Sequence, residues 1–126
     1  MIERPIPGSD PSEETAEYGF SSATSLLADL QSGELSSVEL TEALLVRIAE
    51  VDDSEDGLKS VLALNADALA QAEYADARRA DADHSNLPLL GLPVLVKDNI
   101  EAVGLPATAG SLALAGRPVV ADAPLV

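Results

Sequence analysis

The sequence predicts an α/β layered fold, because segments with helical spacing alternate with short apolar runs that are typical of strands. Helices are predicted over residues 22–33, 36–51 and 66–82, and strands over 60–64 and 93–97. A chain of 126 residues is long enough for one domain. Since Ala, Leu and Val make up most of the apolar fraction and aromatic residues are scarce, we expect a thin core.

The first two helices carry recognisable end signals. Leucines within residues 26–30 share one helical face, and Gly33 suits the left-handed residue that ends a helix. Ser36 and Glu39 have the spacing of a capping box, in which a hydroxyl and a carboxylate each accept from a free backbone N–H. The second helix is therefore predicted to begin at Ser36 and to run to about residue 51.

The next two elements are a strand and an alanine-rich helix. The run 60–64 is a strand candidate, and Asn65 after it can cap the third helix. That helix places Leu69, Ala72 and Ala75 inward. A face this narrow predicts close packing on a sheet.

The second strand, 93–97, is apolar on both faces, which indicates a central position in the sheet. It ends at Lys97, one of two lysines in the chain, and would hold that residue at the edge of the core. A lysine at a strand end usually faces solvent. Asp98 and Asn99, which follow, are turn formers that can bond their own backbone, and neither is expected to be catalytic.

Charge and composition limit the possible partners and compartment. The formal net charge of −15 disfavours nucleic acid and anionic membranes as partners. The lack of cysteine, of a signal peptide and of a long apolar run predicts a cytoplasmic protein. Residues 1–20 contain three prolines and several glutamates, and we expect a flexible acidic leader there.

The sequence predicts neither a metal site nor a cofactor. Residues 52–57 resemble the start of a calcium loop, but Ser54 stands at the third position and Ala63 at the twelfth, where a bidentate Glu is needed. A solvated acidic loop is therefore expected. His84 has no second His or Cys near it and is expected to be an exposed loop residue.

Two blocks in order, residues 91–100 (GLPVLVKDNI) and 104–111 (GLPATAGS), closely resemble the amidase signature family. Residues 32–43 are similar to its N-terminal helical hairpin, so the resemblance covers about 22–126. It implies that residues 21–126 are the N-terminal portion of an incomplete amidase domain. The implied fold is a helical hairpin plus helices packed on a few strands of a mixed sheet.

The resemblance also implies a chemistry. In enzymes of this family, the lysine that matches Lys97 is the base of a Ser-cis-Ser-Lys triad that hydrolyses small carboxamides through an acyl-enzyme, without a cofactor. Burial of Lys97 would favour its neutral amine, because desolvation penalises an ammonium. The loop 108–111 is either near the acyl pocket or a plain loop. Ser111 lacks the glycines of a nucleophile elbow, since Ala109 and Ala113 flank it.

The resemblance places both triad serines beyond Val126, and Asp122 with Pro124 resembles a helix start. We therefore expect a gene fragment, a frameshift product or a split subunit, inactive unless a C-terminal partner chain completes it. The alternatives are a noncatalytic acidic interaction module and the amidase subunit of a tRNA-dependent amidotransferase. That subunit shares the block 96–99, whereas residues 107–114 favour general amidases.

Overall fold

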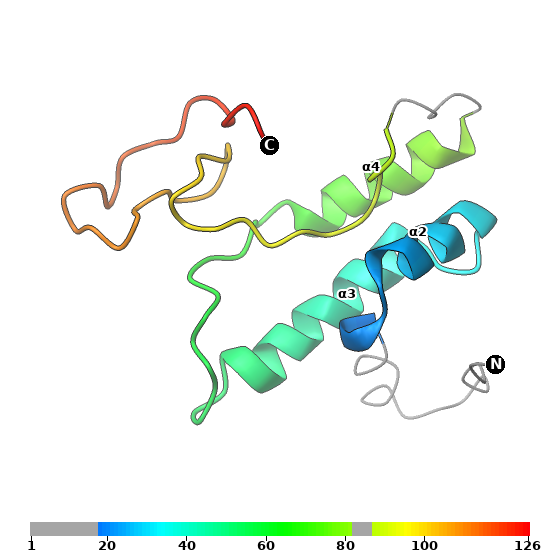
Figure 1. Cartoon of the computed structure of the whole chain (residues 1–126), viewed down its shortest axis with the longest axis horizontal. Coiled ribbons are helices and arrows are strands. Elements are labelled where there is room, and N and C mark those ends of the chain that lie inside the picture. The colour runs from blue at the N-terminus through cyan, green and yellow to red at the C-terminus, as the bar shows by residue number, and fades with distance from the viewer. Residues whose placement is uncertain (1–17, 82–86) are drawn as a thin grey trace.

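The computed structural model describes residues 18–81 and 87–126, and the regular structure within these ranges is helical. Figure 1 shows α3 and α4 side by side, while residues 87–126 run as loops to the C-terminus. The elements in chain order are α2 (Ala23–Ser32), α3 (Ser37–Arg47), the short π-helix η1 (Ile48–Asp52) and α4 (Ala68–Ala80).

The predicted helix 22–33 is confirmed as α2. The Ser22 hydroxyl accepts a hydrogen bond from the Ser25 N–H at 3.1 Å, so Ser22 is the N-cap. Gly33 ends the helix in the left-handed conformation with φ 76°, which costs glycine little because it has no Cβ. Both ends are therefore encoded locally.

The predicted helix 36–51 is confirmed as α3 followed by η1. Ser36 and Glu39 form the capping box, with the Ser36 hydroxyl 3.1 Å from the Glu39 N–H and the Glu39 carboxylate 2.9 Å from the Ser36 N–H. The last turn widens into the π-helix Ile48–Asp52. The helical path thus extends one residue beyond the predicted end.

The third predicted helix is confirmed as α4. Ala72 and Ala75 are buried, and α4 makes its helix contacts with α3. Leu69, predicted to face inward, is 38% exposed. Asn65 does not cap the helix, because its side-chain oxygen accepts from the N–H of Asp67, which is itself the N-cap residue.

The predicted sheet is wrong: no strand occurs in residues 18–81 or 87–126. The runs 60–64 and 93–97 lie outside regular structure. A strand needs a ladder of hydrogen bonds to a neighbour, and neither run has one alongside. The narrow alanine face of α4 therefore packs with a helix instead of a sheet.

The core is thin, as expected. Its central cluster contains Leu26 and Leu30 from α2, Leu35 from the connection and Leu40 from α3, and Leu92 packs against it. Each buried leucine contributes roughly 1.5–3 kcal/mol relative to an exposed one.

Of the predicted leader 1–20, residues 1–17 lie outside the described part of the chain, so the leader stays a prediction.

Candidate functional site

Lys97 lies at the start of a turn, because its carbonyl accepts a hydrogen bond from the Ile100 N–H at 2.8 Å. The residue is exposed, and the run before it is not a strand. The prediction that a strand holds Lys97 at the edge of a core is therefore wrong for this chain. Residues 18–81 and 87–126 leave the Lys97 side chain exposed to solvent.

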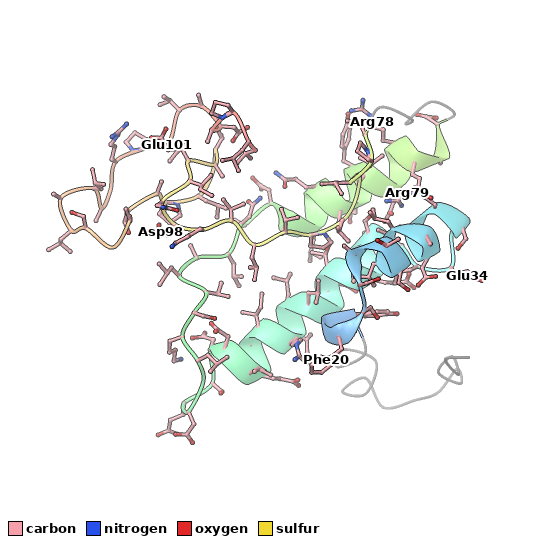
Figure 2. The ribbon with its side chains drawn as sticks, in the orientation of Figure 1. Phe20, Glu34, Arg78, Arg79, Asp98 and Glu101 are labelled. Carbon is pink, nitrogen blue, oxygen red and sulfur yellow. The ribbon has the colours of Figure 1, made fainter. Side chains whose placement is uncertain are left out.

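Asp98 joins the two sequence blocks that resemble the amidase signature. Its carboxylate accepts from the Thr108 N–H at 2.9 Å, from the Thr108 hydroxyl at 2.6 Å and from the Gly110 N–H at 3.2 Å. Its carbonyl accepts from the Ala109 N–H at 3.2 Å. We call Asp98, Thr108, Ala109 and Gly110 the Asp98 cluster. Asp98 lies on the loops beyond α4, as does Glu101 (Figure 2).

The backbone of this cluster is bent sharply. Ala109 has φ 49° and Gly110 has φ 73°, so two successive residues adopt the left-handed conformation. For a residue with a Cβ this conformation costs roughly 1–2 kcal/mol. The bend lets the N–H groups of residues 108–110 all reach Asp98.

The hydrogen bond from the Thr108 hydroxyl lowers the pKa of Asp98, and that from the Thr108 N–H lowers it further. Asp98 is thus held as a carboxylate. Sequence reasoning identified Asp98 only as a turn former. The one signal in the sequence was the Thr-x-Gly spacing of residues 108–110, which is typical of a tight loop whose N–H groups are available to an acceptor such as Asp98.

A second carboxylate fixes the far end of this loop region. The Asp122 carboxylate accepts from the Val103 N–H at 2.7 Å, and the Ala123 N–H donates to the Glu101 carbonyl at 2.8 Å. Asp122 was predicted to start a helix, but residues 121–126 are not helical. Residues 97–103, 108–110 and 122–123 are therefore tied into one loop unit.

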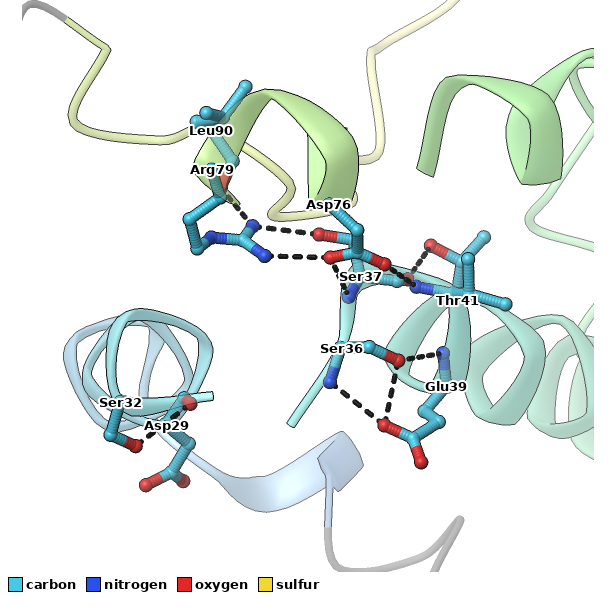
Figure 3. A network of polar contacts seen from close by, with 10 residues as sticks. Asp29, Ser32, Ser36, Ser37, Glu39, Thr41, Asp76, Arg79 and Leu90 are labelled. Carbon is cyan, nitrogen blue, oxygen red and sulfur yellow. Dashed lines mark hydrogen bonds and ion pairs between the residues drawn. The ribbon is translucent and has the colours of Figure 1, made fainter. Parts of the chain in front are cut away.

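Arg79 connects the helices to the chain at Leu90, ahead of this loop unit (Figure 3). Its guanidinium donates to the Asp76 carboxylate at 2.7 Å, to the Ser37 hydroxyl at 2.8 Å and to the Leu90 carbonyl at 2.9 Å. The Asp76 carboxylate also accepts from the N–H groups of Ser37 and Val38, at 2.8 and 3.1 Å. We call these five residues the Arg79 network. It joins α3, α4 and the chain that leads to Lys97.

The network keeps Asp76 ionised although the residue is partly buried. Burial raises the pKa of Asp76, but the hydrogen bonds from the Ser37 N–H, from Arg79 and from the Val38 N–H together outweigh it and leave the pKa lowered. An anion at the first turn of α3 is also favoured by the helix dipole. The sequence analysis did not single out Asp76 or Arg79, because the α3 groups that they bind lie far away along the chain.

The calcium-like loop is only partly the solvated loop that was expected. Asp53 is exposed and pairs with Lys59 at 2.9 Å. Asp52 is 6% exposed, and its carboxylate accepts from the N–H groups of Ser60 and Val61 at 2.8 and 2.9 Å and from the Ser60 hydroxyl. Asp52, the last residue of η1, therefore ties the end of that helix to the start of the run 60–64.

Within the described ranges, no group of three or more His, Cys, Asp or Glu residues is arranged to hold a metal ion. His84 lies outside these ranges, so its exposure stays a prediction. None of the helices described here is long and apolar enough to serve as a membrane span.

The Amidase family model matches residues 39–126, more than half of the chain. This chain belongs to the amidase family. The matched range contains Lys97 and all of the Asp98 cluster, so the resemblance seen in the two sequence blocks is confirmed.

Curated relatives of this amidase-family chain are named as one of the subunits of glutamyl-tRNA(Gln) amidotransferase. The protein from Roseiflexus sp. (strain RS-1) is 47% identical over 98 residues, covering 77% of this chain and 19% of the relative. That from Renibacterium salmoninarum is 46% identical over 96 residues, covering 75% of this chain and 18% of the relative. The chain thus spans about a fifth of the length of the curated relatives it matches.

The hydrogen-bonded carboxylates predict a loss of stability in acid. The pKa values of Glu39, Asp52, Asp76 and Asp98 are all lowered in the folded chain. A depressed folded pKa stabilises the fold above the unfolded pKa, about 4, and this contribution is lost as the pH falls through the folded value. We expect the urea midpoint, measured in molar salt to screen the net charge, to be level from pH 7 to 5 and to fall below about pH 4. A midpoint that rises below pH 4 would contradict this.

Proposed function

We propose that this chain supplies the lysine-bearing N-terminal part of an amidase that cleaves the C–N bond of small carboxamides. Lys97 is the base of its Ser-cis-Ser-Lys triad, and the enzyme acts in the cytoplasm. The family match over residues 39–126, which includes Lys97, is the observation that carries the proposal.

The proposed reaction needs a neutral amine at Lys97. The amine draws a proton through the bridging serine, and the nucleophilic serine attacks the carboxamide carbon. As the C–N bond breaks, the lysine returns this proton to the departing nitrogen, so ammonia leaves and an acyl-enzyme remains. Water releases the acid from the acyl-enzyme and regenerates the serine hydroxyl.

Both serines would come from sequence outside residues 1–126, on the same polypeptide or on a partner chain. Exposed apolar side chains among residues 94–112 support this. Val94 is 66% exposed, Leu95 78% and Leu112 92%. Covering these side chains with the remainder of the enzyme would bury apolar area, and it would also give Lys97 the desolvation that this chain does not provide.

Membership of an amidotransferase is the second candidate, and the name of the relatives favours it. In that case the nitrogen released from a carboxamide would pass to glutamyl-tRNA(Gln) instead of being lost to water. The net charge of −15 argues that tRNA contacts would be made by other parts of such an enzyme.

A chimera tests the role of Lys97. This chain replaces the matching 98-residue segment of the Roseiflexus sp. relative, and ammonia release is measured on simple carboxamides, glutamine included. We expect Lys97→Arg to abolish turnover, because a guanidinium keeps the charge but is not deprotonated in proteins. The matched control is Lys59→Arg, at the other lysine, which should leave turnover unchanged.

The pure 126-residue chain should release no ammonia from any of these carboxamides. Turnover that survives Lys97→Arg would overturn the proposed base. A chimera that folds but has no activity even with Lys97 intact would favour the noncatalytic interaction module.

A further inference from the structure

The backbone of Lys97 fixes the point from which its side chain extends. Among the described residues, no acceptor bonds the Lys97 ammonium, so the side chain is not steered at its tip. The backbone around it is held on one side by the Ile100 N–H, which donates to the Lys97 carbonyl at 2.8 Å. On the other side it continues directly into Asp98.

Asp98 bonds residues that lie ten to twelve positions further along the chain. One carboxylate oxygen accepts from the Thr108 N–H, and the other accepts from the Thr108 hydroxyl and the Gly110 N–H. The Thr108 hydroxyl in turn accepts from the Gly110 N–H at 3.1 Å. The turn that begins at Lys97 is thus fixed against a bent loop.

We propose that Asp98 is a positioning residue for Lys97, acting through Thr108. This inference rests on the proposed function of Lys97. Both Asp98 oxygens are already engaged within the cluster, so Asp98 does not itself handle a proton or a substrate. Its role is to hold the turn from which the Lys97 side chain extends. This matters for the rate, because a displacement of a catalytic group by about 1 Å can lower the rate about 100-fold.

Aspartate suits this position better than its amide. An Asn would keep one acceptor oxygen, but its NH₂ group would face the donors of residue 108 or 110. Asp98→Asn should therefore free at least one of these N–H groups. A hydroxyl is needed at position 108, because it donates to the second carboxylate oxygen of Asp98. Thr108→Val keeps the shape of the side chain but removes this hydroxyl, whereas Thr108→Ser keeps it.

The test uses the chimera described above and the 126-residue chain. In the chimera, Asp98→Asn and Thr108→Val are expected to lower kcat by about 10- to 100-fold with KM within about twofold, because the lysine is displaced but the substrate contacts are not. Thr108→Ser is expected to restore kcat to within about threefold of the parent. Asp122→Asn is the matched control, since Asp122 also bonds a backbone N–H of the loop unit but does not adjoin Lys97.

Hydrogen exchange in the 126-residue chain gives a readout that does not depend on activity. We expect Asp98→Asn to speed exchange of the Thr108 and Gly110 amides by at least about tenfold, and Asp122→Asn to leave them unchanged. Unchanged exchange in Asp98→Asn, or an unchanged kcat, would overturn the positioning role. So would a kcat for Thr108→Ser as low as that for Thr108→Val.

The two proposals fail in different ways. If Lys97→Arg keeps its turnover, Lys97 is not the base and the proposed function fails first. If Lys97→Arg is inactive while Asp98→Asn has the parent kcat, only the positioning role is lost.

Discussion

Replacing Asp76 with alanine is expected to lower the free energy of unfolding of this chain by about 2–3 kcal/mol, the sum of a lost helix cap and a lost charge-assisted hydrogen bond. The Asp76 carboxylate accepts from the first two N–H groups of α3 and from Arg79. The side chains of Arg79 and Asp76 are only 13% and 24% exposed, so water replaces these bonds poorly. The alanine variant would leave the two amides without this acceptor and would remove the carboxylate partner of the Arg79 guanidinium.

Urea unfolding followed by circular dichroism measures this change. The matched control is Glu73→Ala, an exposed carboxylate on the same helix, which should shift stability by no more than about 0.5 kcal/mol. Asp76→Asn should lie between the two, since its amide keeps one acceptor oxygen. Equal urea midpoints for Asp76→Ala and Glu73→Ala would show that the Arg79 network adds nothing to stability.

The helices could be predicted because their signals are local. Gly33, Ser36 and Glu39 each act within a few residues of their own position, so the sequence shows both donor and acceptor. The thin core followed in the same way from the scarcity of large side chains. These features need no knowledge of which distant segments meet.

The strands could not be predicted from their composition, because a strand exists only with a partner. The runs 60–64 and 93–97 have the apolar composition of strands, yet the described part of the chain has no strand beside either of them. The predicted burial of Lys97 depended on the strand 93–97, so it was wrong for the same reason. The position of Lys97 within the family match was predictable, whereas its surroundings were not.

The polar networks were also beyond the sequence. Asp76 reaches amides 38 and 39 positions away, and Arg79 reaches a hydroxyl 42 positions away. Helix spacing alone pairs Asp76 with Arg79, but it does not indicate the α3 amides that Asp76 binds or the Ser37 hydroxyl that Arg79 binds. The Asp98 cluster spans a shorter gap, but its bend depends on left-handed residues at 109 and 110, and only Gly110 signals such a conformation.

Replacing Gly91 with alanine is expected to destabilise the chain by about 3 kcal/mol, since it adds left-handed strain and breaks charged hydrogen bonds. Gly91 has φ +83°, and a Cβ there would lie 2.0 Å from the Ser37 hydroxyl oxygen and 2.2 Å from an Arg79 guanidinium nitrogen. Arg79 would have to leave Ser37 and the Leu90 carbonyl, which are its links to the chain leading to Lys97.

Gly104→Ala separates strain from contact, because Gly104 has φ +86° but nothing within 4 Å of its added Cβ. This control should lose only about 1–2 kcal/mol, the cost of the left-handed conformation. The excess loss in Gly91→Ala then measures the close approach to Ser37 and Arg79. Combining it with Ser37→Ala, which removes the nearer oxygen, should recover part of the excess, and an equal loss in Gly91→Ala and Gly104→Ala would mean that Arg79 adjusts at no cost.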